Sequence, residues 1–378
     1  MTALYGSLLE RLVGARRFGM KLGLERMRDL LDRLGEPDRQ LGTVVHIGGT
    51  NGKGSTVAMV AALARAAGKR VATYTSPHLS TLRERITIDG ALVSEDDMVA
   101  AAERLVAAGG DELTFFEQVT AIAMLVIAKH AVDITVLEVG LGGRLDATNV
   151  VAAPIAAVTG VAFDHEAVLG NTLAAIAFEK AGIFKPGQRA FVGAAGEPEA
   201  VPLLVQHARD AGVTDVRVVA EPADVPLALA GAHQQRNAAL ALALVDALGL
   251  EPDRNVLASL QHPGRFEIAG DVILDGAHNP HGARALAATL RERGIRPVLV
   301  IALSADKDVR AIAEALAPMV SAVIATRYQQ ERAFPPDELA AQFPQAETAP
   351  DLAAALARAR ELGSPILIAG SLFIVGEA

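Results

Sequence analysis

Short runs of β-branched and other apolar residues alternate with longer runs rich in alanine and leucine along most of the chain. Several short runs are apolar on both faces, which is typical of buried parallel strands. The runs expected to form strands are TVVHIG, VATYTS, DITVLEVG, PIAAVTGVAF, DVILDGA, RPVLVIAL, SAVIATR and SPILIAG. The runs STVAMVAALARAAG and EDDMVAAAERLVAAGG have helical spacing and end at glycines, as helices commonly do. This alternation predicts an α/β fold with mostly parallel sheets.

The alternation pauses once, around residues 261–267. Before this point NAALALALVDALGLEPDRNVLASL predicts a helix, a turn and a second helix, and after it the strands resume at DVILDGA. A chain of 378 residues also exceeds what one core usually organises. We therefore expect two α/β domains, a large one over residues 1–262 and a smaller one over residues 263–378.

Composition excludes several functions. The net charge of −9 argues against a general nucleic-acid or membrane-surface binder, which would normally be basic. The chain has no cysteine, so disulfides, thiolate metal sites and cysteine nucleophiles are excluded. Since it has neither an apolar run long enough to span a bilayer nor a secretory signal core, we expect a cytoplasmic protein with no nucleic-acid or membrane partner.

The segment HIGGTNGKGST, residues 46–56, has the composition of a phosphate-binding loop. A strand-like run precedes it, a helix-like run follows it, and Lys53 could reach the β- and γ-phosphates of a nucleotide. The strict GxxxxGK[ST] pattern is not met, because the spacing from Gly48 is one residue short and Gly54 follows the lysine. A nucleotide loop and a plain glycine-rich turn are both open at this point.

Polar residues at the ends of two other predicted strands are candidate magnesium ligands. Ser76 follows VATYT, and Glu138 ends the apolar run of DITVLE, where an unpaired carboxylate would be costly to bury. Both could offer oxygen atoms to a hard cation. The alternatives are a proline turn for residues 75–88, with its arginines paired to Glu84, and an ion pair between Glu138 and Arg144.

Four later residues add candidate chemistry. His165 and Asp275 follow strand-like runs, His278 comes three residues after Asp275, and Lys180 lies in a helical stretch. A lone histidine is more often structural than a ligand. An ammonium cannot ligate a cation, so Lys180 would need carbamylation to become an oxygen donor.

In their order and spacing these motifs resemble those of the folylpolyglutamate synthase/dihydrofolate synthase family, a branch of the Mur-ligase-like ATP-dependent amide ligases. The resemblance covers nearly the whole chain and is carried by GGTNGKGST, YTSPHL, RERITI, TFFEQVTA, EVGLGGRLDATN, DHEAVLGNT, EKAGIFKPG, PGRFE, DGAHNPHGA, DKD and AGSLFIVGE. GTNGK alone would also fit cell-wall Mur ligases, whereas its combination with SPHL and DATN indicates the folate branch.

The resemblance implies a P-loop ATPase-like N-terminal domain and a smaller Rossmann-like C-terminal domain. It implies a monomeric ligase that joins L-glutamate to a folate-type carboxylate through an acyl phosphate, in tetrahydrofolate polyglutamylation, dihydrofolate synthesis from dihydropteroate, or both. The alternatives are a Mur-type ligase with another carboxylate acceptor and an ATP-hydrolysing switch without ligase activity. The expected partners are the small-molecule substrates.

The resemblance also implies roles for individual residues. Those expected to bind ATP are Asn51, Gly52, Lys53, Gly54, Ser55, Asn237, Arg265 and Asp275. Those expected to hold Mg²⁺, as two ions, are Ser76, Glu138 and His165. Those expected to act in catalysis are Lys53, Lys180 as a carboxylysine, and His278. Those expected to line the pterin or folate pocket are Thr114, Phe115, Phe116, Glu117, Leu145, Asp146 and Ala147. Dihydropteroate-using members often carry an acidic residue near Lys21, and its absence here leaves that activity open.

Overall fold

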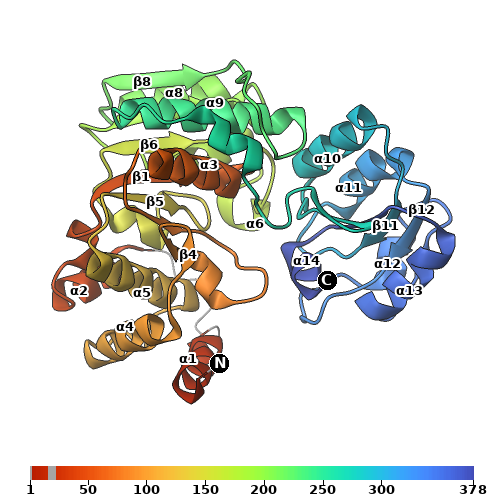
Figure 1. Ribbon diagram of the computed structural model, residues 1–378, viewed down its shortest axis with the longest axis horizontal. Helices are drawn as coiled ribbons and strands as arrows, with labels where there is room; N and C mark the ends of the chain where they lie inside the picture. The colour runs from red at the N-terminus through yellow and green to blue at the C-terminus, as the bar shows by residue number, and fades with distance from the viewer. Residues whose placement is uncertain (1, 16–22) are drawn as a thin grey trace. The chain divides into compact units, whose positions relative to one another are not determined.

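The computed structural model describes residues 2–15 and 23–378, so the position around Lys21 lies outside the described residues. The chain divides into two compact units (Figure 1). Unit 1 comprises Met1–Val161, Leu173–Ala223 and Arg236–Leu257, and unit 2 comprises Ala162–Thr172, Asp224–Gln235 and Ala258–Ala378. The boundary expected between residues 262 and 263 stays a prediction for the functional domains. In the division by packing, the C-terminal part of unit 2 begins at Ala258, slightly before the expected boundary. Unit 2 also includes the two earlier segments Ala162–Thr172 and Asp224–Gln235.

Unit 1 is built on an eight-stranded sheet with the order β4-β3-β2-β5-β1-β6-β7-β8. Its strands are β1 (Thr43–Gly48), β2 (Val71–Tyr74), β3 (Ile86–Ile88), β4 (Ala91–Leu92), β5 (Ile134–Glu138), β6 (Ile155–Val158), β7 (Arg189–Gly193) and β8 (Asp215–Val219). Its helices are α1 (Ala3–Ala15), α2 (Glu25–Arg33), α3 (Lys53–Ala66), α4 (Glu95–Ala107), α5 (Phe115–His130), α7 (Leu173–Ala181), α8 (Ala200–Asp210) and most of α9 (Ala232–Ala247).

The central strand β1 explains why this sheet is mostly parallel. Every β1 residue after Thr43 is buried, and the strand pairs in parallel with β5 on one side and β6 on the other. A strand covered on both faces can be apolar throughout, as TVVHIG nearly is. Only β3 and β4, at one edge, pair antiparallel with their neighbours.

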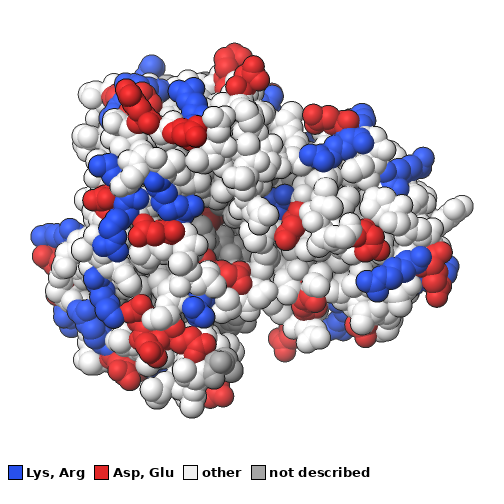
Figure 2. All heavy atoms as spheres, viewed as in Figure 1, with Lys and Arg blue, Asp and Glu red and all other residues white. Residues whose placement is uncertain are grey.

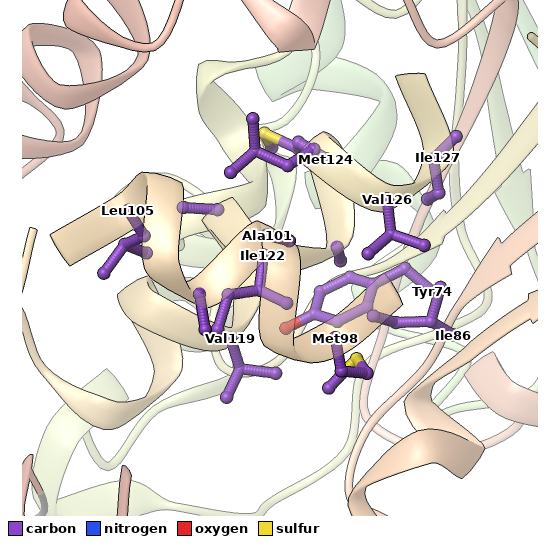
Figure 3. Close-up of a cluster of buried hydrophobic side chains, with 14 of the residues drawn as sticks. Tyr74, Ile86, Met98, Ala101, Leu105, Val119, Ile122, Met124, Val126 and Ile127 are labelled. Atoms are coloured by element: carbon purple, nitrogen blue, oxygen red, sulfur yellow. The ribbon is translucent and has the colours of Figure 1, made fainter. Parts of the chain in front are cut away.

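Helices α4 and α5 enclose one part of the core against β2 (Figure 3). Tyr74, Met98 and Ile122 are each 1 % exposed or less. The Tyr74 hydroxyl forms a 2.9 Å hydrogen bond with Thr120 Oγ1, so its polar atom has a partner inside the apolar cluster. The apolar run AIAMLVIA lies in α5 and serves this core. None of the helices in the described part of the chain is long and apolar enough to cross a bilayer.

Unit 2 is a second α/β layer structure on a six-stranded sheet with the order β13-β12-β11-β14-β10-β9. Its strands are β9 (Glu267–Ala269), β10 (Val272–Leu274), β11 (Val298–Ile301), β12 (Ala322–Ala325), β13 (Glu347–Thr348) and β14 (Ile366–Ala369). Its helices are α6 (Glu166–Leu169), α10 (Pro280–Glu292), α11 (Val309–Leu316), α12 (Pro336–Ala340), α13 (Leu352–Leu362) and α14 (Leu372–Glu377). All pairings are parallel except that of β9 with β10. The predicted α/β class is confirmed in both units.

Two local expectations differ from the structure. The second helix expected in EPDRNVLASL is a 3₁₀ segment, η5 (Arg254–Ser259), and the Asp253 carboxylate accepts the Asn255 N–H just before it, which favours a tight turn. The strands that were not expected are β3, β4, β7, β8, β9 and β13, most of which are short or lie at a sheet edge. β8 forms an edge of the sheet and is only partly buried, so it lacks the continuous apolar run of the central strands.

Charged side chains are mixed in sign over the molecular surface. On the face shown in Figure 2, Lys and Arg side chains are interspersed with Asp and Glu rather than gathered into one basic area. On this face the mixed signs accompany the net charge of −9 of the whole sequence.

Candidate active site

The carboxyl ends of the central parallel strands in unit 1 bring three predicted motifs to one sheet edge. β1 ends at Gly48 and runs into the glycine-rich loop, β5 ends at Glu138, and β2 ends just before Ser76. Ile47 and Glu138 are paired in the β1–β5 register. This is the edge at which open α/β sheets bind ligands.

Two glycines in the loop have backbone conformations that a side chain would disturb. Gly49 has φ of 139°, and a Cβ there would clash with Thr159 Oγ1. Gly52 has φ of 82°, and a Cβ there would clash with Asn237 Oδ1. The loop is also tied to the end of β6, because Thr159 Oγ1 donates to the Asn51 carbonyl at 2.6 Å. It leads directly into α3 at Lys53, so N–H groups at a helix N-terminus face the loop, as in phosphate sites.

Two lysines meet at this loop. Lys53 Nζ donates to the carbonyl oxygens of Gly49 and Thr50 at 3.1 and 3.2 Å. Lys180 Nζ, from α7, donates to the same Gly49 oxygen at 3.1 Å and belongs to a residue that is only 4 % exposed. The Lys53 ammonium beside the N–H groups of the loop suits a polyanion such as the phosphates of a nucleotide.

Glu138 lies 5 % exposed at the end of β5, and its Oε2 atom accepts the Ser76 N–H at 3.1 Å. Arg144, the alternative partner suggested by the sequence, pairs instead with Glu179 at 2.7 Å. Among the residues that the structure describes, no group of three or more His, Asp or Glu side chains could hold a metal by itself. A divalent cation near Glu138 would therefore draw further oxygen ligands from Ser76, substrate phosphates or water, as Mg²⁺ commonly does.

The arginines after Ser76 do not pair with Glu84. The Glu84 carboxylate accepts three backbone N–H groups, from Leu79, Ser80 and Thr81, at 2.7 to 3.0 Å. Arg85 Nε donates to His78 Nδ1 at 2.9 Å. The segment is thus a well-braced turn at the end of β2.

The residues expected at the start of the pterin pocket form the N-terminus of α5. Thr114 and Glu117 make a capping box, and Arg26 Nη2 pairs with Glu117 Oε1 at 2.9 Å. The Arg85 guanidinium carbon lies 5.5 Å from the centroid of the Phe115 ring. The ring centroids of Phe116 and Tyr74 are 6.3 Å apart. Their contact with a substrate stays a prediction.

The Asp146 carboxylate organises the other half of the expected pocket. Its Oδ2 accepts the N–H groups of Gly140 and Leu141 at 3.1 and 2.9 Å. Its Oδ1 accepts the Thr148 N–H at 3.0 Å and the Thr148 hydroxyl at 2.5 Å. Burial raises the pKa of Asp146, and these hydrogen bonds oppose the rise. The flanking Leu145 is half-buried and Ala147 is buried.

In unit 2, Asp275 braces the turn that contains Arg265. Its carboxylate accepts the N–H groups of Phe266 at 2.9 Å and Ala277 at 2.8 Å. Burial raises the pKa of Asp275, against the opposing charge of Arg265. Three residues on, His278 Nδ1 lies 2.7 Å from the Gly276 carbonyl oxygen, so Nδ1 carries the proton and donates.

A cluster around Asp164 in unit 2 was not expected from the sequence. Its carboxylate accepts from Lys307 Nζ at 2.6 Å and from Asn279 Nδ2 at 2.9 Å, and His278 Nε2 lies 3.6 Å away. Burial alone would raise the pKa of Asp164, but hydrogen bonding to His278 and the neighbouring positive charges outweigh it and hold the pKa far below its usual range. The sequence features that could have indicated this cluster are Asp164, the first residue of DHEAVLG, and Lys307, the lysine of DKD.

His165 follows Asp164 in a left-handed conformation, with φ of 53°. Its N–H donates to Asp164 Oδ1 at 2.9 Å, and its ring nitrogens lie 3.9 Å from carboxylate oxygens of Asp164 and Asp306. Burial lowers the pKa of His165 to about 4, so the ring is neutral at physiological pH and could act as a ligand.

The structure thus gathers the predicted residues into two sets. In unit 1, Asn237 and Lys180 meet the loop of Asn51 to Ser55, and Ser76 meets Glu138. His165, Arg265, Asp275 and His278 all belong to unit 2. The roles expected of both sets in one active site stay predictions.

Comparisons with known proteins bear on both units. Residues 47–195 match the family model for the Mur ligase middle domain, and residues 264–372 match that for the Mur ligase, glutamate ligase domain. A probable bifunctional folylpolyglutamate synthase/dihydropteroate synthase of Haloferax volcanii is 38% identical over 420 residues, covering 99% of this chain. The chain spans about half the length of that relative, 50%.

Solved structures match over almost their whole length. Escherichia coli FolC in complex with DHPP and ADP superposes with a TM-score of 0.89 at 32% identity, over 99% of this chain and 96% of that one. The bifunctional folylpolyglutamate synthase/dihydrofolate synthase of Yersinia pestis, complexed with AMPPNP and Mn, superposes with a TM-score of 0.88 at 29% identity, over 100% of this chain and 97% of that one. A bifunctional folylpolyglutamate synthase/dihydrofolate synthase with Mn, AMPPNP and L-glutamate bound superposes with a TM-score of 0.86 at 29% identity, over 100% and 97% of the two chains.

Proposed function

The chain belongs to the folylpolyglutamate synthase/dihydrofolate synthase family, and on that basis we propose that it is an ATP-dependent ligase that joins L-glutamate to a folate-type carboxylate. The observation that carries the proposal is the meeting of Lys53 and Lys180 at a glycine-bent loop before a helix N-terminus, with the buried Glu138 on the neighbouring strand. Lys53 and the N–H groups of the loop supply the positive potential, and Glu138 supplies the carboxylate, that phosphoryl transfer from ATP requires.

The chemistry needs ATP because a carboxylate does not react usefully with an amine at neutral pH. An oxygen of the acceptor carboxylate attacks the γ-phosphorus of ATP, the bond from that phosphorus to the bridging oxygen breaks, and ADP leaves. The amine of L-glutamate then attacks the acyl carbon of the resulting acyl phosphate. Inorganic phosphate leaves with the bonding electron pair, and the new amide nitrogen gives up a proton.

The residues of unit 1 would stabilise the charge that develops in the first step. Lys53 would turn from the Gly49 and Thr50 carbonyls to the β- and γ-phosphates, while the loop N–H groups hold the other phosphate oxygens. Glu138 and Ser76 would hold a divalent cation, which supplies Lewis-acid stabilisation of the phosphate oxygens when it is bound. We propose Mg²⁺, as two ions, in line with the Mn of the Yersinia pestis structure.

Lys180 is a candidate for covalent modification. The Lys180 ammonium is 4 % exposed and hydrogen-bonded to a loop carbonyl. If it lost a proton to solvent, the amine nitrogen could add to carbon dioxide and release a second proton, which would leave a carbamate with two oxygen donors. We propose that Lys180 is a carboxylysine in the active enzyme, with its new oxygens directed to the loop. A ¹³C-labelled carbamate resonance from protein kept in ¹³C-bicarbonate, absent in Lys180→Gln, is the expected result, and equal signals in both proteins would contradict it.

The acceptor is proposed to be a pteridine compound with a free carboxylate. The Escherichia coli structure holds DHPP, and another solved structure of the bifunctional enzyme holds L-glutamate. These ligands support a dihydropteroate or a folate as acceptor and glutamate as the amine. The residues proposed for the pterin end are Thr114 to Glu117 and Leu145 to Ala147. We also propose a cytoplasmic monomer, to be checked by light scattering on the purified chain.

The decisive experiment is ADP release by the purified chain. ATP, Mg²⁺ and L-glutamate are supplied with dihydropteroate, with a tetrahydrofolate, or with a UDP-muramoyl compound, and product masses are measured. We expect ADP release that depends on a pteridine acceptor and a product heavier by one glutamate residue. Release that depends on the muramoyl compound would indicate a cell-wall ligase instead, and hydrolysis that no acceptor alters would indicate a switch.

A further inference from the structure

A buried row of three polar side chains crosses unit 1 beneath the phosphate loop. His46, on β1, is 0 % exposed, and its Nε2 lies 2.8 Å from Thr148 Oγ1. The Thr148 hydroxyl in turn lies 2.5 Å from Asp146 Oδ1. We call these three residues the His46–Thr148–Asp146 chain.

The direction of each hydrogen bond follows from counting protons. Both oxygens of the Asp146 carboxylate already accept backbone N–H groups, so the carboxylate acts as the acceptor for the Thr148 hydroxyl. Thr148 has a single hydroxyl proton and donates it to Asp146. Its oxygen can therefore only accept from His46, which requires the proton on Nε2.

The environment of the other ring nitrogen of His46 is consistent with this tautomer. Within the described part of the chain, Nδ1 is buried and has no hydrogen-bond partner. Burial, with a smaller contribution from the charge of Lys185, lowers the pKa of His46 to about 3. The imidazole is therefore neutral at physiological pH and has one proton, which it gives to Thr148.

The chain connects the two parts of the proposed site. His46 lies on β1 two residues before Gly48, where the phosphate loop begins. At the other end Asp146 holds the N–H groups of Gly140 and Leu141, directly after β5 and Glu138. The loop from residue 140 to 150 is thus attached to the phosphate-loop strand by side-chain hydrogen bonds, apart from the backbone pairing of β1 with β5.

We propose that His46 is a positioning residue that, through Thr148 and Asp146, holds the loop of residues 140–150 in the position in which its residues bind the pterin end of the acceptor. This inference rests on the proposed function. The Thr148 hydroxyl donates its proton to the Asp146 carboxylate, and the hydrogen bond from His46 sets the direction of that hydroxyl. The carboxylate therefore cannot rotate without leaving a buried donor unpaired.

Substitutions at Thr148 separate this role from simple packing. Thr148→Val keeps the shape and removes the hydroxyl, whereas Thr148→Ser keeps the hydroxyl. We expect Thr148→Val to raise the KM for the pteridine acceptor about tenfold, the scale of one hydrogen bond to a charged group, with the KM for ATP within about twofold. Thr148→Ser should keep both constants within about twofold.

The matched control is Thr135→Val. Thr135 is another fully buried threonine of unit 1, and its hydroxyl donates to the Leu41 carbonyl at 2.6 Å, away from the loop. We expect it to lower the melting temperature without changing the acceptor KM. An unchanged acceptor KM in Thr148→Val, or a tenfold loss in Thr148→Ser, overturns the proposal.

Substitutions at His46 test the first link. Gln can place an N–H near the Nε2 position and should keep the acceptor KM within about threefold, whereas His46→Leu should raise it as much as Thr148→Val. The double variant His46→Leu/Thr148→Val should be no worse than Thr148→Val alone, because one broken link already interrupts the side-chain attachment of the loop to β1. Additive losses would show that the residues act separately.

Nitrogen NMR of the His46 ring distinguishes failure of this inference from failure of the proposed function. The wild-type protein should show a neutral ring protonated at Nε2, and the Nε2 signal should shift in Thr148→Val but much less in Thr148→Ser. A proton on Nδ1 overturns the inference even if the ligase is active. No acceptor-dependent ADP release, with the Nε2 tautomer present, refutes the proposed function and the pterin-binding role while leaving the hydrogen-bonded chain intact.

Discussion

Lys53 and Lys180 donate to the same carbonyl oxygen, that of Gly49, from helices α3 and α7. The Lys53 ammonium lies beside the N–H groups of the loop and of the α3 N-terminus, so together they can hold an anion there. At the level of single residues, the proposed chemistry therefore depends on these two side chains in different ways. Lys53 is half-buried and adjoins the helix N-terminus, whereas Lys180 is buried and reaches the loop from another part of the sequence.

The first prediction concerns Lys53→Ala. We expect acceptor-dependent ADP release to fall by a factor of about 10² to 10³, because one charge-stabilising donor is removed from the phosphoryl-transfer site. The control is Lys69→Ala, which removes an exposed lysine just after α3 and should leave the rate within about twofold. Near-normal turnover in Lys53→Ala would contradict the assignment of the loop.

The second prediction concerns the pH dependence of stability. The pKa of His46 is lowered from 6.5 to about 3 in the folded protein, so the unfolded state binds a proton that the folded state excludes. The stabilisation is present above pH 6.5 and is lost as the pH falls towards 3, by up to about 1.4 kcal/mol per pH unit. Urea unfolding of wild type and His46→Gln at pH 7, 5 and 4 measures this, and the wild type should lose more stability than the variant. Parallel curves would contradict a buried neutral imidazole.

At the scale of elements, helix termini and turns hold the candidate site. The N-terminus of α3 directs backbone N–H groups to the loop, and the capping box of Thr114 and Glu117 starts α5 next to the aromatic residues Phe115 and Phe116. Removing a threonine N-cap typically costs about 1 kcal/mol. Thr114 can therefore cap the helix and also line the proposed pterin pocket. The cap fixes the residue at which α5 begins, and so it fixes the positions of Phe115 and Phe116.

The third prediction compares two glycines at opposite ends of α3. Gly52 and Gly68 have φ values of 82° and 78°, so alanine is strained by a similar amount at both. A Cβ at Gly52 would also clash with Asn237, whereas a Cβ at Gly68 has open space around it. Gly68→Ala should lose about 1 kcal/mol of stability from backbone strain, and Gly52→Ala should lose more because of the clash. Only Gly52→Ala should weaken binding of an ATP analogue, by tenfold or more, measured by calorimetry. Equal affinities in the two variants would argue against a nucleotide at this loop.

At the scale of the whole molecule, the chain consists of two α/β units, each with its own sheet and its own cluster of polar residues. The cluster around Asp164 and Lys307 ties residues 162–172 to unit 2, although this segment directly follows strand β6 of unit 1 in the sequence. Since unit 1 carries the loop and Glu138, the proposed nucleotide and cation should stabilise the molecule chiefly through unit 1.

The fourth prediction concerns ligand-linked stability. MgATP at one hundred times its dissociation constant should raise the free energy of unfolding by about 2.7 kcal/mol by mass action. Removing the cation with EDTA should abolish most of this gain, and Glu138→Gln should reduce the Mg²⁺-dependent part, as measured by thermal unfolding. Asp133→Asn, at an exposed carboxylate just before β5, serves as the control. An equal gain with and without EDTA would contradict a cation site at Glu138.

Much of this protein was predictable from local sequence patterns. The run TVVHIG forms β1 with the expected bounds, and the alternation of apolar runs and the order of the motifs are enough to indicate the α/β class and the family. These features are predictable because periodic burial and turn-forming glycines act over a few neighbouring residues. The motifs are local in the same way, which is why the glycine-rich loop could be proposed as a phosphate site although it departs from the strict pattern.

The tertiary structure alone decided which distant residues meet. It paired Arg144 with Glu179, joined residues 162–172 to unit 2, and assembled both the Asp164 cluster and the His46–Thr148–Asp146 chain. His46 and Thr148 are 102 residues apart, and Asp164 and Lys307 are 143 apart. The amino-acid sequence by itself determined the elements, the loop and the family, because those depend on local chemistry. The partners of buried polar groups depended on packing between segments far apart in the chain, where each polar group must find a hydrogen bond once water is excluded.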